Sequence, residues 1–304
     1  MPELPEVETI RRGLEKVLLG QKLVTSAPDL ASSGRSRGAK LSLLPKGNSP
    51  HMLPKDAMVS RGKVTGLRRF GKLLVIDFSN GESLAFHLRM TGQLVYRSNS
   101  GERLAGGHPN KSFIEGLPDK TTRAIFEFED GTLFFNDQRK FGFYEFLPTS
   151  EVEKMPFVAK LGPEPWDITF ANFKKRLMRH KRSKIKAVLL DQTVMAGLGN
   201  IYADETLYFA HVHPERLVES LTDSEIKKII SGAKHSMEES LKSGGSSLKN
   251  YLRVDGTYGD YLTLFAKVYG RKGEPCECGG VVEKIKVAGR GTHFCPKCQK
   301  APKA

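Results

Sequence analysis

The chain has 304 residues, 39% of them hydrophobic, and its 48 lysines and arginines outnumber 34 aspartates and glutamates, giving a formal net charge of +14. This length suffices for two domains and a small module, and the positive charge predicts a polyanionic partner, most simply nucleic acid. No apolar run reaches the roughly 18 residues of a membrane span. The N-terminus lacks the basic and apolar regions of a signal peptide, so we expect an intracellular protein.

The N-terminal segment 1–8 carries the first chemical signal. Removal of Met1, which the small Pro2 favours, would leave a secondary amine that is partly unprotonated at neutral pH. Such an amine can attack carbon and form a Schiff-base intermediate. Glu3 lies beside it and Glu6 one helical turn further on. The alternative is an ordinary helix start with acids that favour the helix dipole. Apolar residues at helical spacing predict a helix that anchors this terminus: Val7, Ile10, Leu14, Val17 and Leu18.

Strand signals follow a Ser-, Gly-, Pro- and Lys-rich segment at about 28–56, which we interpret as a loop insertion. Two pairs of hydrophobic runs meet across Asn80-Gly81 and Asp130-Gly131, which are strong hairpin signals. A second loop insertion is expected at about 98–120. Residues 1–150 are therefore predicted to form a helix and an antiparallel β sandwich or barrel.

The second half of the chain is predicted to be helical after a linker at 151–166 that contains three prolines. Thr222 and Glu225 form a capping box ahead of a helix with one apolar face. Segment 174–186 holds eight lysines or arginines and no acid, which suits either phosphate binding or a solvated helix face. The glycine-rich turn 197–200 opens another helix, whose amide groups and Asn200 side chain would seat a phosphate.

All four cysteines lie near the C-terminus, so none remains for a disulfide framework across the body of the chain. In a reducing compartment such a cluster indicates a metal site. The predicted ligands are Cys276, Cys278, Cys295 and Cys298.

Taken together, these motifs resemble the formamidopyrimidine-DNA glycosylases, bacterial enzymes that remove oxidised purines from DNA. The resemblance covers nearly the whole chain except the two insertions. It rests on the start Pro-Glu-Leu-Pro-Glu-Val-Glu and on segments 139–142, 161–165, 197–203, 268–273 and the final cysteines. It implies an α+β multidomain fold with DNA in the cleft between the two larger domains. The implied domains are an N-terminal β sandwich (1–150), a linker (151–166), a helix–two-turns–helix domain (167–266) and a zinc finger built on a β hairpin (267–304).

The resemblance also implies the catalytic residues. Pro2 matches the nucleophile, Glu3 the neighbouring acid/base, Glu6 a residue that supports the N-terminal site, and Lys72 a lysine that works beside the scissile nucleotide. Lys72 could otherwise be a strand-start lysine on a solvated face. The implied reaction excises 8-oxoguanine or formamidopyrimidines and then cuts the abasic site by β and δ elimination, after the damaged base has left the stack.

Further residues are implied to contact DNA. Met90, Arg139 and Phe141 match a trio that fills the hole left by the extruded base, although a Met or Phe in a strand is usually core. The resemblance assigns phosphate contacts to Lys186, Asn200 and Arg290, and a lid over the extruded base to residues 244–248 through 258–259.

The zinc finger departs from the family pattern, because its first pair is Cys276-x-Cys278 and is one residue short. Four thiolates can still surround one structural Zn²⁺ tetrahedrally. We expect a monomer that binds duplex DNA with oxidised purines in a bacterial cytoplasm, associated with the nucleoid through its DNA, and no membrane. The alternatives are a related endonuclease for oxidised pyrimidines, which Leu4, Arg139 and Phe141 disfavour, and a non-catalytic damaged-DNA-binding protein.

Overall fold

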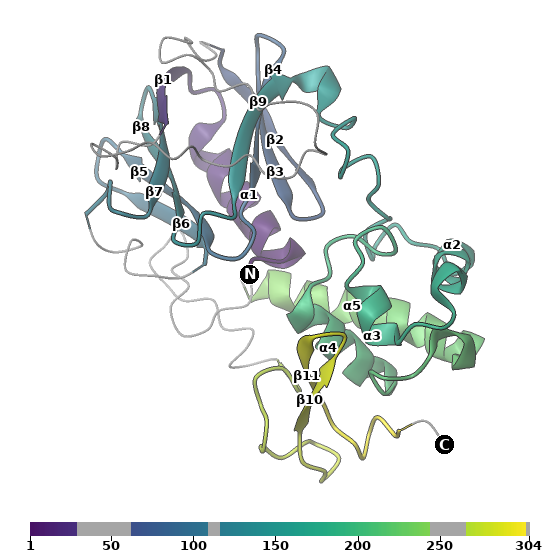
Figure 1. Cartoon of the computed structure of the whole chain (residues 1–304). Coiled ribbons are helices and arrows are strands. Elements are labelled where there is room, and N and C mark those ends of the chain that lie inside the picture. The colour runs from purple at the N-terminus through teal and green to yellow at the C-terminus, as the bar shows by residue number, and fades with distance from the viewer. Residues whose placement is uncertain (29–61, 109–115, 244–265, 302–304) are drawn as a thin grey trace. The chain divides into compact units, whose positions relative to one another are not determined.

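The computed structural model describes residues 1–28, 62–108, 116–243 and 266–301 (Figure 1). The chain forms two compact units. Among the described residues, the first unit contains Met1–Pro2 and Val7–Lys154, and the second contains Glu3–Glu6, 155–243 and 266–301. The predicted insertion at 28–56 and the predicted lid fall almost wholly outside the described residues. Among the described helices, none combines the length and apolar character needed to cross a membrane.

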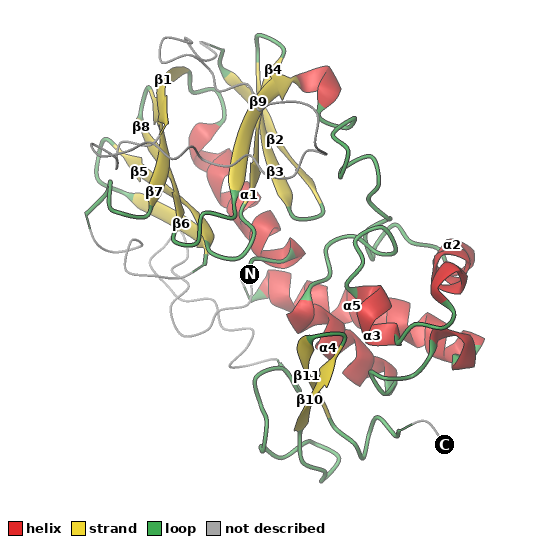
Figure 2. Ribbon diagram, in the orientation of Figure 1, coloured by secondary structure: helices red, strands yellow, loops and turns green. Residues whose placement is uncertain are grey.

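The first unit contains α1 (Leu4–Leu18, all but its first turn) and two antiparallel sheets (Figure 2). One sheet has the strand order β1-β7-β8-β5-β6 and the other β2-β3-β4-β9. The strands are β1 (Leu23–Pro28), β2 (Val64–Phe70), β3 (Leu73–Phe78), β4 (Glu82–His87), β5 (Gly92–Ser98), β6 (Arg103–Gly107), β7 (Thr122–Phe128), β8 (Gly131–Asp137) and β9 (Phe143–Pro148), with η2 (Thr149–Glu151) after them.

The predicted hairpins are present, because β3 pairs with β4 around Asn80-Gly81 and β7 pairs with β8 around Asp130-Gly131. One expectation was wrong: the segment 98–120, predicted as a loop, contains β6, which pairs with β5 and forms the edge of the sheet. Its sequence Arg-Leu-Ala-Gly-Gly lacks β-branched and aromatic residues, so only pairing with β5 makes it a strand.

The hydrophobic core of this unit takes side chains from α1 and from both sheets. The predicted apolar face of α1 is buried against strands of each sheet, and Phe86 of β4 meets Phe126 of β7 edge to face at 5.4 Å. Glu8 of α1 also pairs with Arg69 of β2 at 3.0 Å. Burial alone would raise the pKa of Glu8, but hydrogen bonds from Arg11, Arg12 and Arg69 outweigh it and lower that pKa to about 2.

The second unit is helical and ends in a β hairpin. The capping box predicted at Thr222 and Glu225 is formed at the start of α5, and the predicted apolar face of this helix is buried. Its elements are α2 (Phe170–Leu177), η3 (Met178–His180), α3 (Ile185–Leu189), α4 (Asn200–Ala210), η4 (Val218–Ser220), α5 (Asp223–Lys242), β10 (Glu283–Val287) and β11 (Arg290–Phe294).

Helix α4 is buried on nearly all sides and carries two adjacent buried acids, Asp204 and Glu205. Asp204 accepts the backbone N–H of His293 in β11 at 2.9 Å. Glu205 accepts three backbone N–H groups of residues 267–269, at 2.8 to 3.0 Å. The C-terminal hairpin segment is therefore attached to α4 by buried hydrogen bonds to carboxylates.

Candidate active site

The N-terminal residues are held by hydrogen bonds at the first turn of α1. Pro2, Glu3 and Glu6 are buried, and Glu6 Oε2 accepts the backbone N–H of Glu3 at 2.7 Å. This is the half of a capping box in which the carboxylate at the third helical position satisfies the amide that precedes the helix. The peptide bond that joins Pro2 to Glu3 is thus fixed inside the protein.

The Glu3 side chain caps a different helix from the one it precedes. Its carboxylate accepts the N–H of Gly199 and, at 3.0 Å, the N–H of Ile201, both at the start of α4. The positive end of the helix dipole favours a carboxylate at this point. Glu3 therefore occupies two of the amides that the sequence interpretation assigned to a phosphate at this helix start.

The two glycines of the Gly-Leu-Gly turn make this contact sterically feasible. A Cβ at Gly197, where φ is +94°, would lie 2.3 Å from Leu4 Cδ1. A Cβ at Gly199 would lie 2.4 Å from Glu3 Cδ. Leu4 therefore requires glycine at position 197, and Glu3, 196 positions earlier in the chain, requires glycine at position 199.

Lys72 lies in the two-residue turn between β2 and β3, since Phe70 pairs with Leu73. A lysine at a hairpin tip is normally exposed, but Lys72 is buried, which argues against the alternative of a solvated strand-start lysine. His87, which pairs with Leu73, is also buried. Burial, followed by the positive charges of Arg89 and Lys72, lowers the pKa of His87 to about 3, so its imidazole is neutral near pH 7.

The predicted wedge residues lie around a buried acid that sequence reasoning missed. Asp137 ends β8 and accepts the N–H groups of Arg139 at 3.1 Å and Gly142 at 2.6 Å. Thr91 donates its hydroxyl to Asp137 and accepts the Arg139 N–H at 3.0 Å. Asp137 and Thr91 thereby join the loop 138–142 to the turn that carries Met90. The available signal was an acid at the end of a strand, two residues before Arg139.

Phe141 is 54% exposed, so the alternative that it packs in the core is excluded. The Arg139 guanidinium lies over its ring, 4.7 Å from the centroid, and Arg139 is itself exposed. Met90 is half-buried. This loop presents an aromatic ring and a cation at the surface, which suits insertion into a base stack and contact with a base.

The three residues predicted to contact phosphate differ in burial and in hydrogen-bond partners. Lys186 is fully buried, donates to Asp204 Oδ1 at 2.6 Å and to the Asn200 carbonyl at 2.9 Å, and so does not present its ammonium to a phosphate. Burial lowers the pKa of Lys186 and Asp204 opposes that shift. Asn200 donates its side-chain N–H to the Gly291 carbonyl at 2.8 Å. Arg290, at the start of β11, is exposed and has no acidic partner in the described part of the chain.

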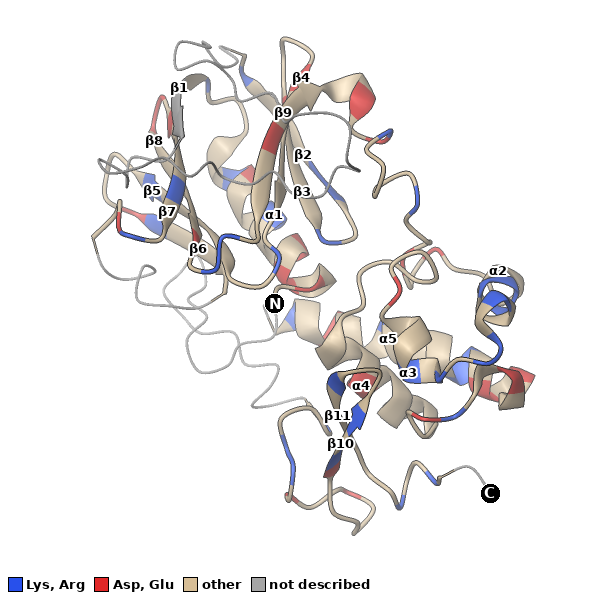
Figure 3. Cartoon of the chain, in the orientation of Figure 1, with Lys and Arg blue, Asp and Glu red and all other residues tan. Residues whose placement is uncertain are grey.

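The basic run, apart from its buried last residue Lys186, places lysines and arginines along α2, η3 and the segment after them (Figure 3). Lys174 pairs with Asp223 and Lys184 with Glu215. Four further cations are exposed and make no ion pair with any described residue: Lys175, Arg179, Lys181 and Arg182. This surface favours the phosphate-binding interpretation of the run.

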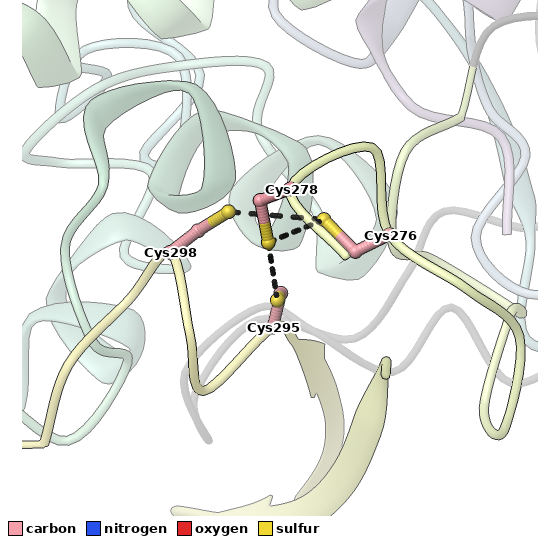
Figure 4. Close-up of side chains that lie close together, drawn as sticks. All are labelled: Cys276, Cys278, Cys295 and Cys298. Atoms are coloured by element: carbon pink, nitrogen blue, oxygen red, sulfur yellow. Dashed lines mark hydrogen bonds between the residues drawn. The ribbon is translucent and has the colours of Figure 1, made fainter. Parts of the chain in front are cut away.

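The four cysteines converge at the base of the β10–β11 hairpin, as predicted (Figure 4). Their Sγ atoms lie within 4.8 Å of one another, with Sγ–Sγ distances of 3.5 Å for Cys276–Cys278, 3.6 Å for Cys278–Cys295 and 3.7 Å for Cys276–Cys298. A tetrahedral zinc with Zn–S bonds of about 2.3 Å needs sulfurs about 3.8 Å apart. The short first pair therefore fits one Zn²⁺, which would stabilise the finger and take no part in the reaction.

Comparisons with known proteins cover almost the whole chain. Family models match residues 1–144 (formamidopyrimidine-DNA glycosylase N-terminal domain), 161–251 (formamidopyrimidine-DNA glycosylase H2TH domain) and 273–301 (zinc finger found in FPG and IleRS). The formamidopyrimidine-DNA glycosylase of Desulforamulus reducens is 39% identical over 99% of this chain and 100% of its own length. That of Pelotomaculum thermopropionicum is 38% identical over 99% of each chain.

Solved structures agree with this similarity. A complex between the Lactococcus lactis Fpg and a DNA that contains an abasic site matches with a TM-score of 0.79 and 34% identity, over 99% of this chain and 100% of that one. A complex of the same Lactococcus lactis protein with a DNA that contains an oxidised pyrimidine matches with a TM-score of 0.78, at the same identity and coverage.

Proposed function

We propose, from the premise that this chain belongs to the formamidopyrimidine-DNA glycosylase family, that it excises oxidised purines from duplex DNA and then cuts the abasic site. The observation that carries the proposal is the arrangement around the N-terminus. The Pro2–Glu3 peptide is held by Glu6, and the Glu3 carboxylate is held by the first amides of α4. Such an arrangement presents an amine and an acid together, which suits a Schiff-base reaction.

In the proposed reaction the lone pair of the Pro2 nitrogen attacks C1′ of the damaged nucleotide. The base leaves with the electrons of the glycosidic bond and takes up the proton that the nitrogen gives up. Glu3 then gives a proton to the sugar ring oxygen, the bond between C1′ and that oxygen breaks, and the nitrogen lone pair forms the C1′=N bond of an iminium. The resulting iminium acidifies the 2′ protons, so that the 3′ phosphate departs by β elimination and the 5′ phosphate by δ elimination. Lys72, buried beside the neutral His87, supplies a cation near the scissile nucleotide.

We propose that Met90, Arg139 and Phe141 fill the gap left by the extruded base. Phe141 would wedge between bases, and Arg139 would donate hydrogen bonds to the unpaired cytosine. The exposure of Phe141 and the support of its loop by Asp137 back this assignment. Arg290 and the exposed cations near α2 would contact phosphates. Lys186 is buried against Asp204 and would support α4 rather than contact a phosphate.

We also propose the division into 1–150, 151–166, 167–266 and 267–304, since the boundary between the two compact units after Lys154 lies inside the linker. A bacterial cytoplasm is the proposed location, because the relatives compared above are bacterial.

Borohydride trapping on a duplex with 8-oxoguanine opposite cytosine tests this function. We expect a covalent protein–DNA band for the wild type and none for Pro2→Gly, with Pro2→Gly still binding the duplex. Absence of the band from the wild type, with mass analysis showing that Met1 has been removed, would refute the proline mechanism. Tight binding without cutting would indicate the non-catalytic alternative.

Cleavage of a second duplex, which contains thymine glycol, distinguishes the proposed purine-specific activity from that of the related pyrimidine endonuclease. We expect faster cleavage of the 8-oxoguanine duplex, because Arg139 is presented at the surface beside Phe141. A strong preference for thymine glycol would contradict the purine assignment.

A further inference from the structure

Tyr202 lies in the interior of the second unit, close to the N-terminal residues. It is fully buried in α4, and its hydroxyl lies 2.6 Å from Glu6 Oε1 and 2.5 Å from Ser240 Oγ. A carboxylate only accepts, so the Tyr202 hydrogen goes to Glu6. Ser240 near the end of α5, also fully buried, must then donate its own hydrogen to the Tyr202 oxygen.

The second oxygen of the Glu6 carboxylate continues this chain of hydrogen bonds. Glu6 Oε2 accepts the N–H of the peptide that joins Pro2 to Glu3, at 2.7 Å. Because both oxygens belong to one rigid planar group, a rotation that moves Oε1 also moves Oε2. The position of the Tyr202 hydroxyl therefore determines where the peptide next to the terminal amine is held.

We propose that Tyr202 is a positioning residue for the N-terminal amine, acting through Glu6, with Ser240 as its own support. This inference rests on the proposed function, because it assumes that the Pro2 nitrogen is the nucleophile. The contribution of the Tyr202 hydroxyl is to fix the orientation of the Glu6 carboxylate in a buried site. A misplacement of about 1 Å at reacting groups can cost roughly 10²-fold in rate.

The test compares two tyrosines that each lose one buried hydroxyl. Tyr202→Phe removes the donor to Glu6 and keeps the ring. Tyr96→Phe is the matched control, since Tyr96 is buried in the first unit and its hydroxyl accepts a hydrogen bond from Gln21 at 3.0 Å. Single-turnover borohydride trapping on a preformed abasic-site duplex measures the attack. The dissociation constant for a duplex with an uncleavable abasic analogue measures binding, and the melting temperature measures folding.

We expect Tyr202→Phe to slow trapping by about 10- to 100-fold while affinity changes by less than about threefold, because the lost interaction serves attack rather than binding. Tyr96→Phe should also lower the melting temperature, by less, and should trap within about twofold of the wild type. Equal trapping rates for the two variants would overturn the inference.

Two results separate this inference from the proposed function. If the wild type forms no trapped product, the proline mechanism itself fails; if it traps and Tyr202→Phe traps equally well, only the role of Tyr202 fails. Should Tyr202→Phe not fold, Ser240→Ala decides, because it removes only the support of the tyrosine. We expect a several-fold slower trapping rate for Ser240→Ala, and an unchanged rate would refute the positioning role.

Discussion

Replacing Gly199 by alanine tests whether the contact between Glu3 and α4 controls the chemistry. The backbone of Gly199 is extended, with φ −125°, so alanine can adopt it without strain. The added methyl group would, however, lie 2.4 Å from Glu3 Cδ and 2.5 Å and 2.7 Å from its two carboxylate oxygens. The three atoms nearest to the added methyl group therefore all belong to the Glu3 side chain.

The size of the effect follows from these distances. Ordinary van der Waals contact begins near 3.4 Å, so the carboxylate carbon must move by 3.4 − 2.4 = 1.0 Å. That movement weakens the hydrogen bonds from Gly199 and Ile201. Bonds to a charged group contribute about 1.5–3 kcal/mol each, so we expect a destabilisation of about 3 kcal/mol. A displacement of about 1 Å at Glu3, the proposed catalytic acid, should also reduce the excision rate by roughly 10²-fold.

The assay measures single-turnover excision of 8-oxoguanine together with the melting temperature. Gly66→Ala is a control in open space on β2. Gly232→Ala is a control for destabilisation, since its Cβ would lie 2.8 Å from the Thr206 carbonyl in the same unit and away from Glu3. If Gly199→Ala excises as fast as Gly232→Ala at equal melting temperature, the reasoning is refuted.

Three further outcomes follow from the described contacts. Lys186→Met should lower the melting temperature, because it leaves Asp204 buried without its cation, at a cost of about 3–5 kcal/mol. The dependence of DNA affinity on salt should stay unchanged. If the slope of log K against log salt became shallower by about 0.9, Lys186 would contact a phosphate directly and this reasoning would be refuted. Elemental analysis should find one zinc per chain, and Cys298→Ser should lose metal and melt at a lower temperature; a wild type with well under one metal per chain would contradict the site. His87, whose pKa burial lowers to about 3, takes up its proton first in the unfolded chain, so stability should fall as the pH drops from about 6.5 toward 3. His87→Gln should lack that part of the pH dependence of the melting temperature, and identical profiles would show that the imidazole is not the group responsible.

Features set by neighbouring residues were predictable from the sequence. Asn80-Gly81 and Asp130-Gly131 turn two hairpins, and Thr222 with Glu225 caps α5, because each device acts within a few residues. The cysteine cluster was predictable because no other role suits four cysteines gathered in one short segment.

Features set by distant residues were not predictable. Glycine at position 199 is required by Glu3, 196 residues earlier, so the local pattern suggested a phosphate seat instead. Lys186 ends a basic run that suggested a surface, and only the helix packing that brings Asp204 to it buries its ammonium. The sequence places Asp137 close to Arg139 but does not reveal its role, because that role consists of hydrogen bonds to loop amides that exist only after folding.

The attachment of the C-terminal hairpin to α4 has a consequence for how separable that hairpin is. Asp204 and Glu205 receive their backbone donors from His293 and from residues 267–269. A chain truncated before residue 267 would keep both carboxylates inside α4 but lose those four amides. The same helix begins with the amides that hold Glu3. Deletion or exchange of the finger should therefore also disturb the start of α4 and the hydrogen bonds to Glu3, next to the proposed nucleophile Pro2.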